Sequence, residues 1–287
     1  MRRKMELFDI VLVLVLTAAS VSILLPLMHV VAGSLSGKIP LMKGAVGMWP
    51  KDLTWINYQL VLENAAFWRA FRVTVFLVVA GTSLNMLFTV VTAYPLSKRY
   101  LPGRRVAMIY IIITMIFSAP LIPTYLLLKN LILLNTVWVM IVPGVINTFN
   151  LILAITFFRA LPEELFEAAR VDGLSEYGMV MRIAMPMALP IVATLSLFYA
   201  VGHWNTYSSG LYFVTNAELK PLQVYLYNII SAGNVEDLAG GSFVDVDITP
   251  EGLKMATIVT ATLPIVIIYP FIQKYFIKGS TLGSLKE

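Results

Sequence analysis

The sequence predicts an all-α membrane protein with six transmembrane helices. Of the 287 residues, 59% are hydrophobic, and the mean hydropathy is +0.81. Apolar runs of about twenty residues recur along the chain, which is the length a helix needs to cross roughly 30 Å of hydrocarbon. Composition and length therefore predict one integral membrane domain rather than two soluble ones.

The content of cysteine, histidine and charge excludes several kinds of site. The chain has no cysteine, so disulfides, thiolate metal sites and cysteine nucleophiles are ruled out together. The two histidines, His29 and His203, lie far apart in the sequence, and we expect no metal site. The formal net charge of +5 is typical of a membrane protein whose Lys and Arg mark the cytoplasmic side, and we expect no nucleic-acid partner.

Six apolar segments can each cross the bilayer. The first follows Arg2-Arg3-Lys4 but is too long for the apolar part of a signal peptide, so we expect an uncleaved helix. The third and fourth are joined by the short connection 129–135, which predicts an antiparallel hairpin. The expected spans are Leu7–Gly33, Phe71–Ser97, Val106–Leu128, Thr136–Phe158, Met187–Tyr207 and Met255–Phe276.

Prolines inside or at the ends of these spans predict kinked helices that could line a pathway. They are Pro26, Pro95, Pro120, Pro123, Pro143 and Pro264.

The distribution of charge predicts that both termini are cytoplasmic. With the N-terminus inside, 13 of the 21 Lys and Arg residues lie on the cytoplasmic side, while the acidic residues divide evenly. The segments 34–70 and 208–254 are then external. Their Trp and Tyr side chains are typical of a membrane-interface belt, and a docking surface is the alternative. We expect residues 1–70 to form an N-terminal helix with an external loop, and residues 71–287 a core of five spans.

A cytoplasmic loop at 159–186 has the most informative local pattern. Pro162 is followed by three acidic residues, as is typical of a helix start, where the helix dipole favours negative charge. Asp172-Gly173 predicts the end of this helix, because glycine readily takes the left-handed conformation of a C-cap. Ser175 can cap a second helix, and Pro186 is expected to open the fifth span. These start and stop signals predict two short helices that lie parallel to the membrane.

The loop also contains a spaced motif: Glu-Ala-Ala, three residues, Gly, nine residues, Ile, one residue, and an apolar residue before Pro. It consists of Glu167, Ala168, Ala169, Gly173, Ile183 and Pro186. On this spacing the loop resembles the EAA motif of the permeases of binding-protein-dependent ABC importers, with Met185 in place of Leu. Taken residue by residue, an ordinary amphipathic loop on the lipid headgroups is the alternative.

Further segments resemble the sugar-importer branch of these permeases, so that the resemblance covers nearly the whole chain. These segments are 101–105, 122–125, 134–136, 157–158, 203–205, 221–223 and 273–279. The likeness is to the smaller permease subunit of importers for oligosaccharides, including the pectin-fragment and alginate types, whose substrates can contain uronic acids.

The resemblance implies the type I ABC importer permease fold and a role for the loop as a coupling helix seated in a cleft of an ATPase. The implied coupling residues are Glu167, Ala168, Ala169, Asp172, Gly173, Ile183 and Pro186. The sequence contains no GxxxxGK[ST] phosphate loop, so the chain is expected to be a transport subunit and not an enzyme. We expect it to bind no cofactor, with ATP and Mg used by the partner ATPase.

The implied partners are a second homologous permease, two cytoplasmic ATPase subunits, an extracytoplasmic solute-binding protein and the oligosaccharide. The implied location is the bilayer of the bacterial cytoplasmic (inner) membrane.

Polar residues within or near the spans are candidates for a substrate pathway. Asn85, Asn147 and Asn150 are costly in a membrane unless they face the interior, and interhelical hydrogen bonding is the alternative. At the outer end of the fifth span, aromatic rings could stack on sugar rings and amides could bind hydroxyl groups; an interface belt is the alternative here. The residues at that end are His203, Trp204, Asn205 and Tyr207.

Two other function classes stay open. A self-sufficient secondary carrier or channel usually needs intramembrane ionisable residues or a repeated pore motif, and His29 is about the only candidate. No internal repeat is evident. An ABC permease for a solute other than sugar is the second alternative, and the segments shared with the sugar branch argue against it.

Overall fold

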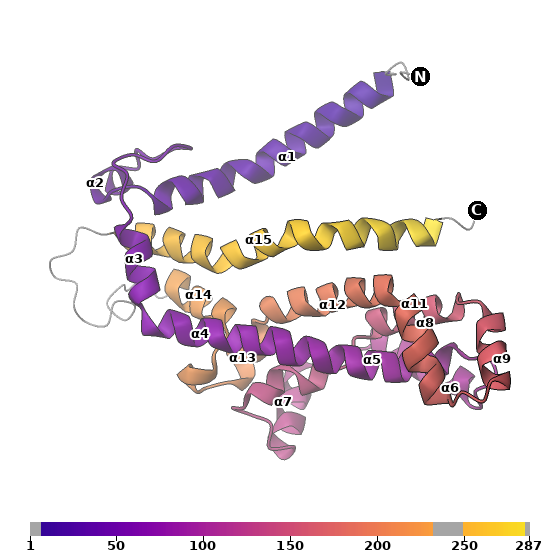
Figure 1. The fold of residues 1–287 in the computed structure, drawn as a ribbon. Coiled ribbons are helices and arrows are strands. Elements are labelled where there is room, and N and C mark those ends of the chain that lie inside the picture. The colour runs from indigo at the N-terminus through magenta and orange to yellow at the C-terminus, as the bar shows by residue number, and fades with distance from the viewer. Residues whose placement is uncertain (1–6, 232–248, 285–287) are drawn as a thin grey trace. The chain divides into compact units, whose positions relative to one another are not determined.

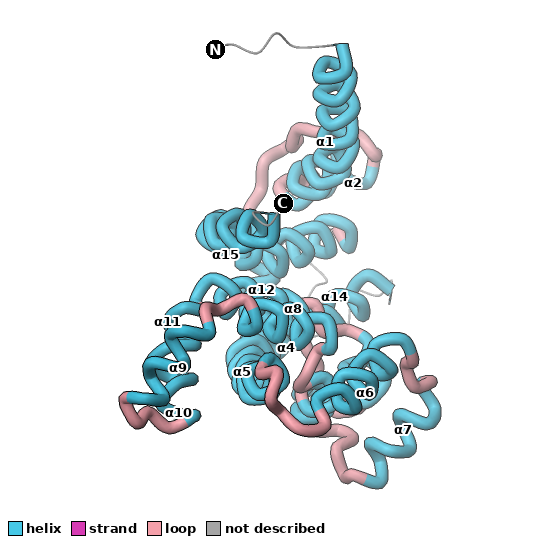
Figure 2. The backbone as a smooth tube through the Cα atoms, turned by 90° about the vertical axis from the view of Figure 1, so that its right-hand side faces the viewer, coloured by secondary structure: helices cyan, strands magenta, loops and turns pink. Residues whose placement is uncertain are grey.

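The computed structural model describes residues 7–231 and 249–284. Within these ranges the regular elements are helices, joined by loops, and there is no strand, which confirms the all-α class (Figures 1 and 2). The chain forms two compact units. One combines the chain up to Trp68 with Tyr225–Val266, and the other combines Arg69–Val224 with the segment from Ile267 onward. The expected domains 1–70 and 71–287 stay a prediction.

The first unit is held together by polar contacts at the C-terminal end of its first helix. Ser34 Oγ lies 2.6 Å from the hydroxyl of Tyr58, and Asn57 Nδ2 donates to the carbonyl of Ser34 over 3.1 Å. Both partners lie on the short third helix. The helices of this unit are α1 (Leu7–Ser34), α2 (Lys38–Met42), α3 (Ile56–Glu63) and parts of α14 (Leu222–Ser231) and α15 (Pro250–Ser284).

The second unit contains the expected loop and the spans around it. Its helices up to the loop are α4 (Ala65–Phe76), the π-helix η1 (Leu77–Gly81), α5 (Thr82–Ser97), α6 (Arg104–Ile116), α7 (Leu121–Asn130), the 3₁₀ helices η2 (Val137–Met140) and η3 (Val142–Gly144), and α8 (Thr148–Arg159). The loop and the chain after it form α9 (Glu163–Val171), α10 (Glu176–Met179), the π-helix η4 (Val180–Ala184), α11 (Met185–Met187), α12 (Leu189–Trp204), α13 (Ser208–Phe213) and the 3₁₀ helix η5 (Ala217–Leu219).

Three helices of the described chain are long and apolar enough to span a membrane unbroken: Phe8–Ser34, Ala65–Ser97 and Pro250–Ile268. Three bent pairs also pass by length and composition if each pair is one span. They are α6 with α7, η2–η3 with α8, and α10–α11 with α12, bent by 119°, 46° and 82°. If each bent pair is one span, the six expected spans correspond to three unbroken helices and three bent pairs.

The third expected span, Val106–Leu128, is bent at one of the prolines that predict a kink. The helix stops at Ile116, the chain runs extended through Phe117, and α7 starts after Pro120. Proline has no amide hydrogen to donate and disfavours a helical residue before it, so a break is favoured at this point. Pro26, by contrast, lies inside an unbroken helix.

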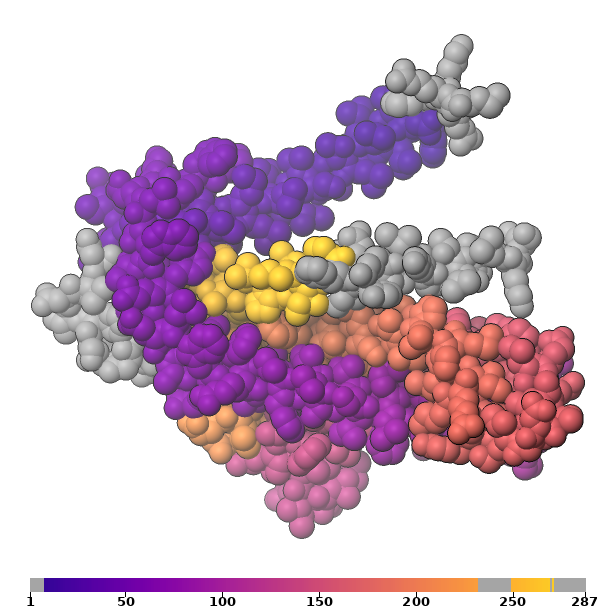
Figure 3. All heavy atoms as spheres, in the orientation of Figure 1, coloured from indigo at the N-terminus to yellow at the C-terminus, as the bar shows by residue number. Residues whose placement is uncertain are grey.

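The core of the second unit lies where α5 packs against α8 and α12. The buried cluster includes Tyr94, Leu151, Ile155 and Phe158 together with Phe166 of the loop, so the loop is part of this core. In the space-filling view the atoms of α9–α11, in red and orange, gather at one end of α5 (Figure 3). Helix α6 contributes no fully buried residue, and most of its apolar side chains face outward.

Candidate coupling site and substrate pathway

The loop forms two helical segments, as its punctuation predicts. Helix α9 starts after Pro162 and is capped at Asp172, and Gly173 has a φ of +78°, in the left-handed region. The amide of Leu174 donates to the carbonyl of Ala169 over 2.9 Å, which satisfies an otherwise free carbonyl at the helix end. Ser175 Oγ accepts from the amide of Gly178 and caps the second segment. The orientation parallel to the membrane stays a prediction.

Helix α9 has one buried face and one exposed face. Phe166 is only 1% exposed and Ala169 is also buried, whereas Glu167 and Ala168 lie on the outer face. The triplet Glu-Ala-Ala therefore has residues on both faces of the helix. Its first two residues are available to a partner, and the small side chain of Ala169 allows α9 to approach its own core.

A buried lysine attaches α9 to the end of α5. Lys98 Nζ lies 3.6 Å from the centroid of the Phe166 ring and 5.3 Å from that of Tyr94. The same ammonium lies 3.5 Å from Glu163 Oε1 in the first turn of α9. The Lys98 side chain is 6% exposed and the Glu163 side chain 56%, so the cation is held mainly between aromatic rings. Nothing in the sequence singles out Lys98 beyond its place among the cytoplasmic charges.

A second contact joins the two segments of the loop. Arg170 of α9 lies 3.7 Å from Glu176 of α10, and the hydroxyl of Tyr100 donates to Glu176 Oε1 over 3.2 Å. The guanidinium of Arg170 lies over the Tyr100 ring, with 5.8 Å from Cζ to the centroid. Burial and the adjacent Glu176 carboxylate raise the pKa of Tyr100, so it stays a neutral donor at physiological pH. These side chains connect α9, α10 and the segment that follows α5.

The C-terminal part of the motif lies differently from the expectation. Pro186 is exposed in α11, before the 82° bend, and does not open the fifth span; α12 starts at Leu189, with Pro190 in its first turn. A proline is well placed in a first helical turn because its missing amide hydrogen has no intrahelical partner there. Ile183 is half-buried and packs against the core cluster. Asp172 is exposed at the end of α9.

Two of the candidate pathway residues meet inside the second unit. Asn85 is 1% exposed, and its Nδ2 donates to the carbonyls of Gly144 and Val145 over 2.8 and 2.9 Å. Its Oδ1 lies 2.7 Å from Nε2 of His203. Because the amide nitrogen is used by two carbonyls, Oδ1 is the acceptor and His203 donates. Gly81 faces the His203 ring so closely that a Cβ would overlap it.

These contacts connect α5, η1 and α12 with the chain just before α8. They are interhelical hydrogen bonds within one chain, which is the alternative role given for Asn85. Contact of Asn85 or His203 with substrate stays a prediction.

The other candidates do not join this pair in one cluster. Asn147 is exposed, and its Oδ1 caps α8 by accepting from the amide of Asn150, which is itself buried. Trp204 is buried with its ring edge-on to Phe71, at 6.0 Å between centroids. The remaining two, Asn205 and Tyr207, are exposed and half-buried, and Nδ2 of Asn205 donates to the Val201 carbonyl. Asn147, Asn205 and Tyr207 are thus the candidates with accessible side chains.

Comparison with known proteins gives three concordant findings. Residues 85–281 match the model of the family described as "Binding-protein-dependent transport system inner membrane component". Protein LplC of Bacillus subtilis is 39% identical over 98% of this chain and 95% of its own length. The polygalacturonan/rhamnogalacturonan transport system permease protein YtcP of Bacillus subtilis is 36% identical over 99% of both chains.

The fold is also known from a solved structure. A chain from the crystal structure of a bacterial ABC transporter involved in the import of the acidic polysaccharide alginate superimposes with a TM-score of 0.89. The two chains are 33% identical, and the likeness covers 94% of this chain and 96% of the other. The chain therefore belongs to the family of binding-protein-dependent transport system inner membrane components, and it has the type I fold of the ABC importer permeases.

Proposed function

We propose that this chain is one of two permease subunits of an ATP-driven importer that moves oligosaccharides into the cytoplasm by alternating access. The observation that supports this most directly is the construction of α9. Its outer face presents Glu167 and Ala168, while its inner face is fixed to the transmembrane core through Phe166 and Lys98. A helix built in this way can receive a displacement from a partner and pass it to α5.

The proposed partners are a second homologous permease, two cytoplasmic ATPase subunits and an external solute-binding protein. Closure of the ATPases moves paired coupling helices and tips the spans as rigid bodies between inward-facing and outward-facing states. Glu167 makes a charged contact with the ATPase. Ala168 and Gly173, both exposed, allow its surface to approach closely. This chain binds no cofactor, and ATP and Mg are used by the ATPase.

The proposed topology places the loop and both termini in the cytoplasm, in the inner membrane of a bacterium. It is supported by the excess of Lys and Arg on the side of the loop. Several of the basic residues that count toward this excess, Arg2, Arg3, Lys4 and Lys286, lie outside the described residues.

The proposed substrates are oligosaccharides that contain uronic acids, such as fragments of pectin or alginate. Support comes from the relative named for polygalacturonan and rhamnogalacturonan transport, and from the likeness to a transporter involved in alginate import. Within this chain, Asn147, Asn205 and Tyr207 have side chains accessible to a sugar. Buried Asn85, Asn150, His203 and Trp204 support the walls around them.

The test is transport by the assembled importer in liposomes. The chain is purified with the subunits that accompany it, and uptake of labelled oligogalacturonides and alginate oligomers is measured with and without ATP and the binding protein. We expect uptake that requires ATP and is competed by the uronic-acid oligomers. Uptake by the purified chain alone without ATP would instead establish a secondary carrier or channel. Uptake of amino acids or ions in place of sugars would overturn the substrate class.

A further inference from the structure

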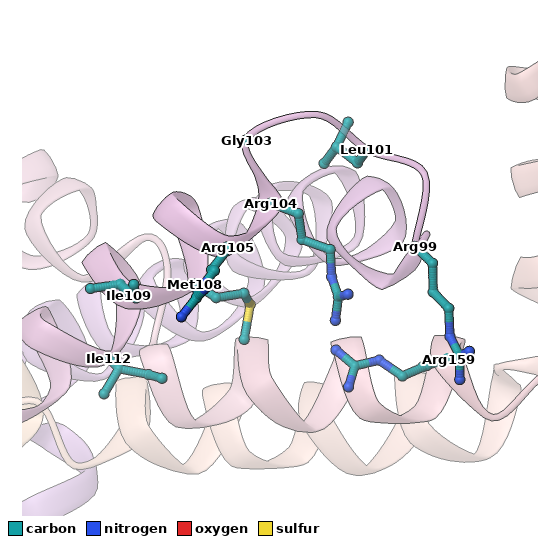
Figure 4. A pocket seen from close by; sticks show the side chains of 9 residues that line it. All are labelled: Arg99, Leu101, Gly103, Arg104, Arg105, Met108, Ile109, Ile112 and Arg159. Carbon is teal, nitrogen blue, oxygen red and sulfur yellow. The ribbon is translucent and has the colours of Figure 1, made fainter.

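A basic pocket lies where the start of α6 meets the end of α8. Its volume is about 650 Å³, within the range of small-ligand sites, and four of its lining residues are arginines: Arg99, Arg104, Arg105 and Arg159. The other lining residues are apolar side chains and a glycine, with no carboxylate among them. Figure 4 shows the guanidinium groups of Arg104 and Arg159 pointing toward one another.

The positive charge of this pocket is not neutralised within the chain. Among the residues that the structure describes, no carboxylate lies within ion-pair distance of the four arginines, although Lys98 and Arg170 nearby have carboxylate partners. One arginine is fixed in place: Arg104 Nε donates to the Leu96 carbonyl over 2.8 Å. The like charges of Arg104 and Arg159 repel one another, so an anion between these two groups would be stabilised.

The first turn of α6 adds to the positive potential. A helix N-terminus carries partial positive charge and free amide hydrogens, and acidic residues or anions stabilise it. Helix α6 has Arg104 and Arg105 at this end, no acidic residue in its first turn, and no side-chain cap from Gly103. The two arginines are therefore unfavourable next to the positive end of the helix dipole, and a bound anion would offset this repulsion.

The rest of the pocket indicates what kind of anion fits. Met108, Ile109 and Ile112 lead away from the arginines along α6. Beyond the pocket the outer face of α6 stays apolar, with Ile113 and Ile116 exposed. An anionic head next to an apolar track matches a phospholipid, whereas inorganic phosphate would use only the arginines.

We propose that this pocket binds an anionic phospholipid, with the phosphate held by Arg104 and Arg159 and an acyl chain lying along Met108 and Ile112. Basic pockets at the ends of transmembrane helices are suited to such headgroups. We place this lipid in the cytoplasmic leaflet, and that placement rests on the proposed topology of the importer. The ligand class rests on the pocket itself and does not require that the importer carries sugar.

The test measures which lipids stay bound to the purified importer. The chain with its accompanying subunits is placed in nanodiscs of equal phosphatidylcholine and phosphatidylglycerol, and retained lipids are counted by native mass spectrometry. The test variant combines Arg104→Gln and Arg159→Gln. The control combines Lys129→Gln and Lys220→Gln, which removes the same charge from lysines that do not line the pocket. Thermal unfolding verifies that both variants are folded.

We expect phosphatidylglycerol to be enriched on the wild type and the control, and the enrichment to fall at least about tenfold in the arginine variant. Equal enrichment in the arginine variant would refute the site. Displacement of the lipid by millimolar inorganic phosphate would assign the pocket to the free ion instead. A wild type without enrichment would also overturn the proposal. None of these outcomes depends on uptake of oligosaccharide.

Discussion

At the scale of single residues, Lys98 makes two kinds of interaction, a contact with aromatic rings and an ion pair with Glu163. Mutation can separate their contributions to stability. We expect Lys98→Met to reduce the stability of the assembled importer by about 1 kcal/mol, because it removes the cation over Phe166 and Tyr94. Glu163→Gln should cost less than about 0.5 kcal/mol, since it removes only an ion pair with an exposed partner. Thermal unfolding and ATP-driven uptake measure both effects.

Lys98→Arg is the matched control, because it keeps a cation that can stack on the rings. It should retain most of the stability and uptake. If Glu163→Gln were as damaging as Lys98→Met, the ion pair and not the aromatic contact would hold α9 to α5.

Asn85 allows a contrasting prediction, because both polar atoms of its side chain are hydrogen-bonded. Asn85→Ala leaves the buried Nε2 of His203 without its partner and removes the donor from two less buried carbonyls, and we expect a loss of about 1–3 kcal/mol in stability. Gln59→Ala is the control, since this exposed amide is outside the candidate pathway and bonds to Glu63 within its own helix. Unfolding of the purified importer gives stability, and the concentration dependence of uptake gives substrate affinity. A variant of Asn85 with unchanged stability and weakened affinity would show that Asn85 contacts substrate instead.

The same residue shows why burial could not be predicted. A polar residue in an apolar run predicts only that it faces something other than lipid. Its partners on η3 and α12 are 59 and 118 positions away along the chain, and their closeness depends on how the helices pack. Lys98 is similar, because a basic residue at the end of a span is expected to extend into the headgroups, whereas here it lies against Phe166 of a helix distant in the sequence.

At the scale of elements, the turn between α9 and α10 depends on Gly173. Its φ of +78° is accessible to glycine, tolerable for asparagine and closed to proline, whose ring fixes φ near −65°. We expect Gly173→Pro to abolish uptake and ATPase stimulation while membrane insertion stays normal, and Gly173→Asn to retain most of the activity. Uptake, ATP hydrolysis and the amount of protein in the membrane are the measurements. Normal uptake by the proline variant would argue strongly against coupling through this loop.

Local punctuation predicted the short helices of the loop well, because Pro162, Gly173 and Ser175 each act on neighbouring backbone groups. The long spans were predicted less well, since hydropathy reports the environment of a segment and not its shape. Pro120 and Pro26 illustrate the difference. The first stands at a break of 119° and the second inside a continuous helix. Whether neighbouring groups satisfy the freed carbonyls decides between the two outcomes, and that is a property of packing.

At the scale of the whole molecule, family membership confirms a multi-pass membrane permease and agrees with the motif spacing of the loop. The prediction succeeded at this level because the motif combines several positions at fixed intervals, and each position has a local structural cause. The packing of Ala169 inward and Ala168 outward is compatible with the same spacing, so the spacing does not reveal it.

The topology of the whole chain can be tested directly, because the chain has no cysteine and single cysteines can serve as labels. Suitable positions are Val171, which is 88% exposed in α9, and Leu131, which is exposed just after α7. If the bent pair α6–α7 is one span, only the span ending in α8 separates the two positions. We therefore expect a membrane-impermeant maleimide to label Leu131→Cys only in right-side-out vesicles and Val171→Cys only in inverted vesicles. Labelling of both from the cytoplasmic side would mean that neither of the bent pairs α6–α7 and η2–η3 with α8 crosses the membrane, and the chain would have four spans and not six.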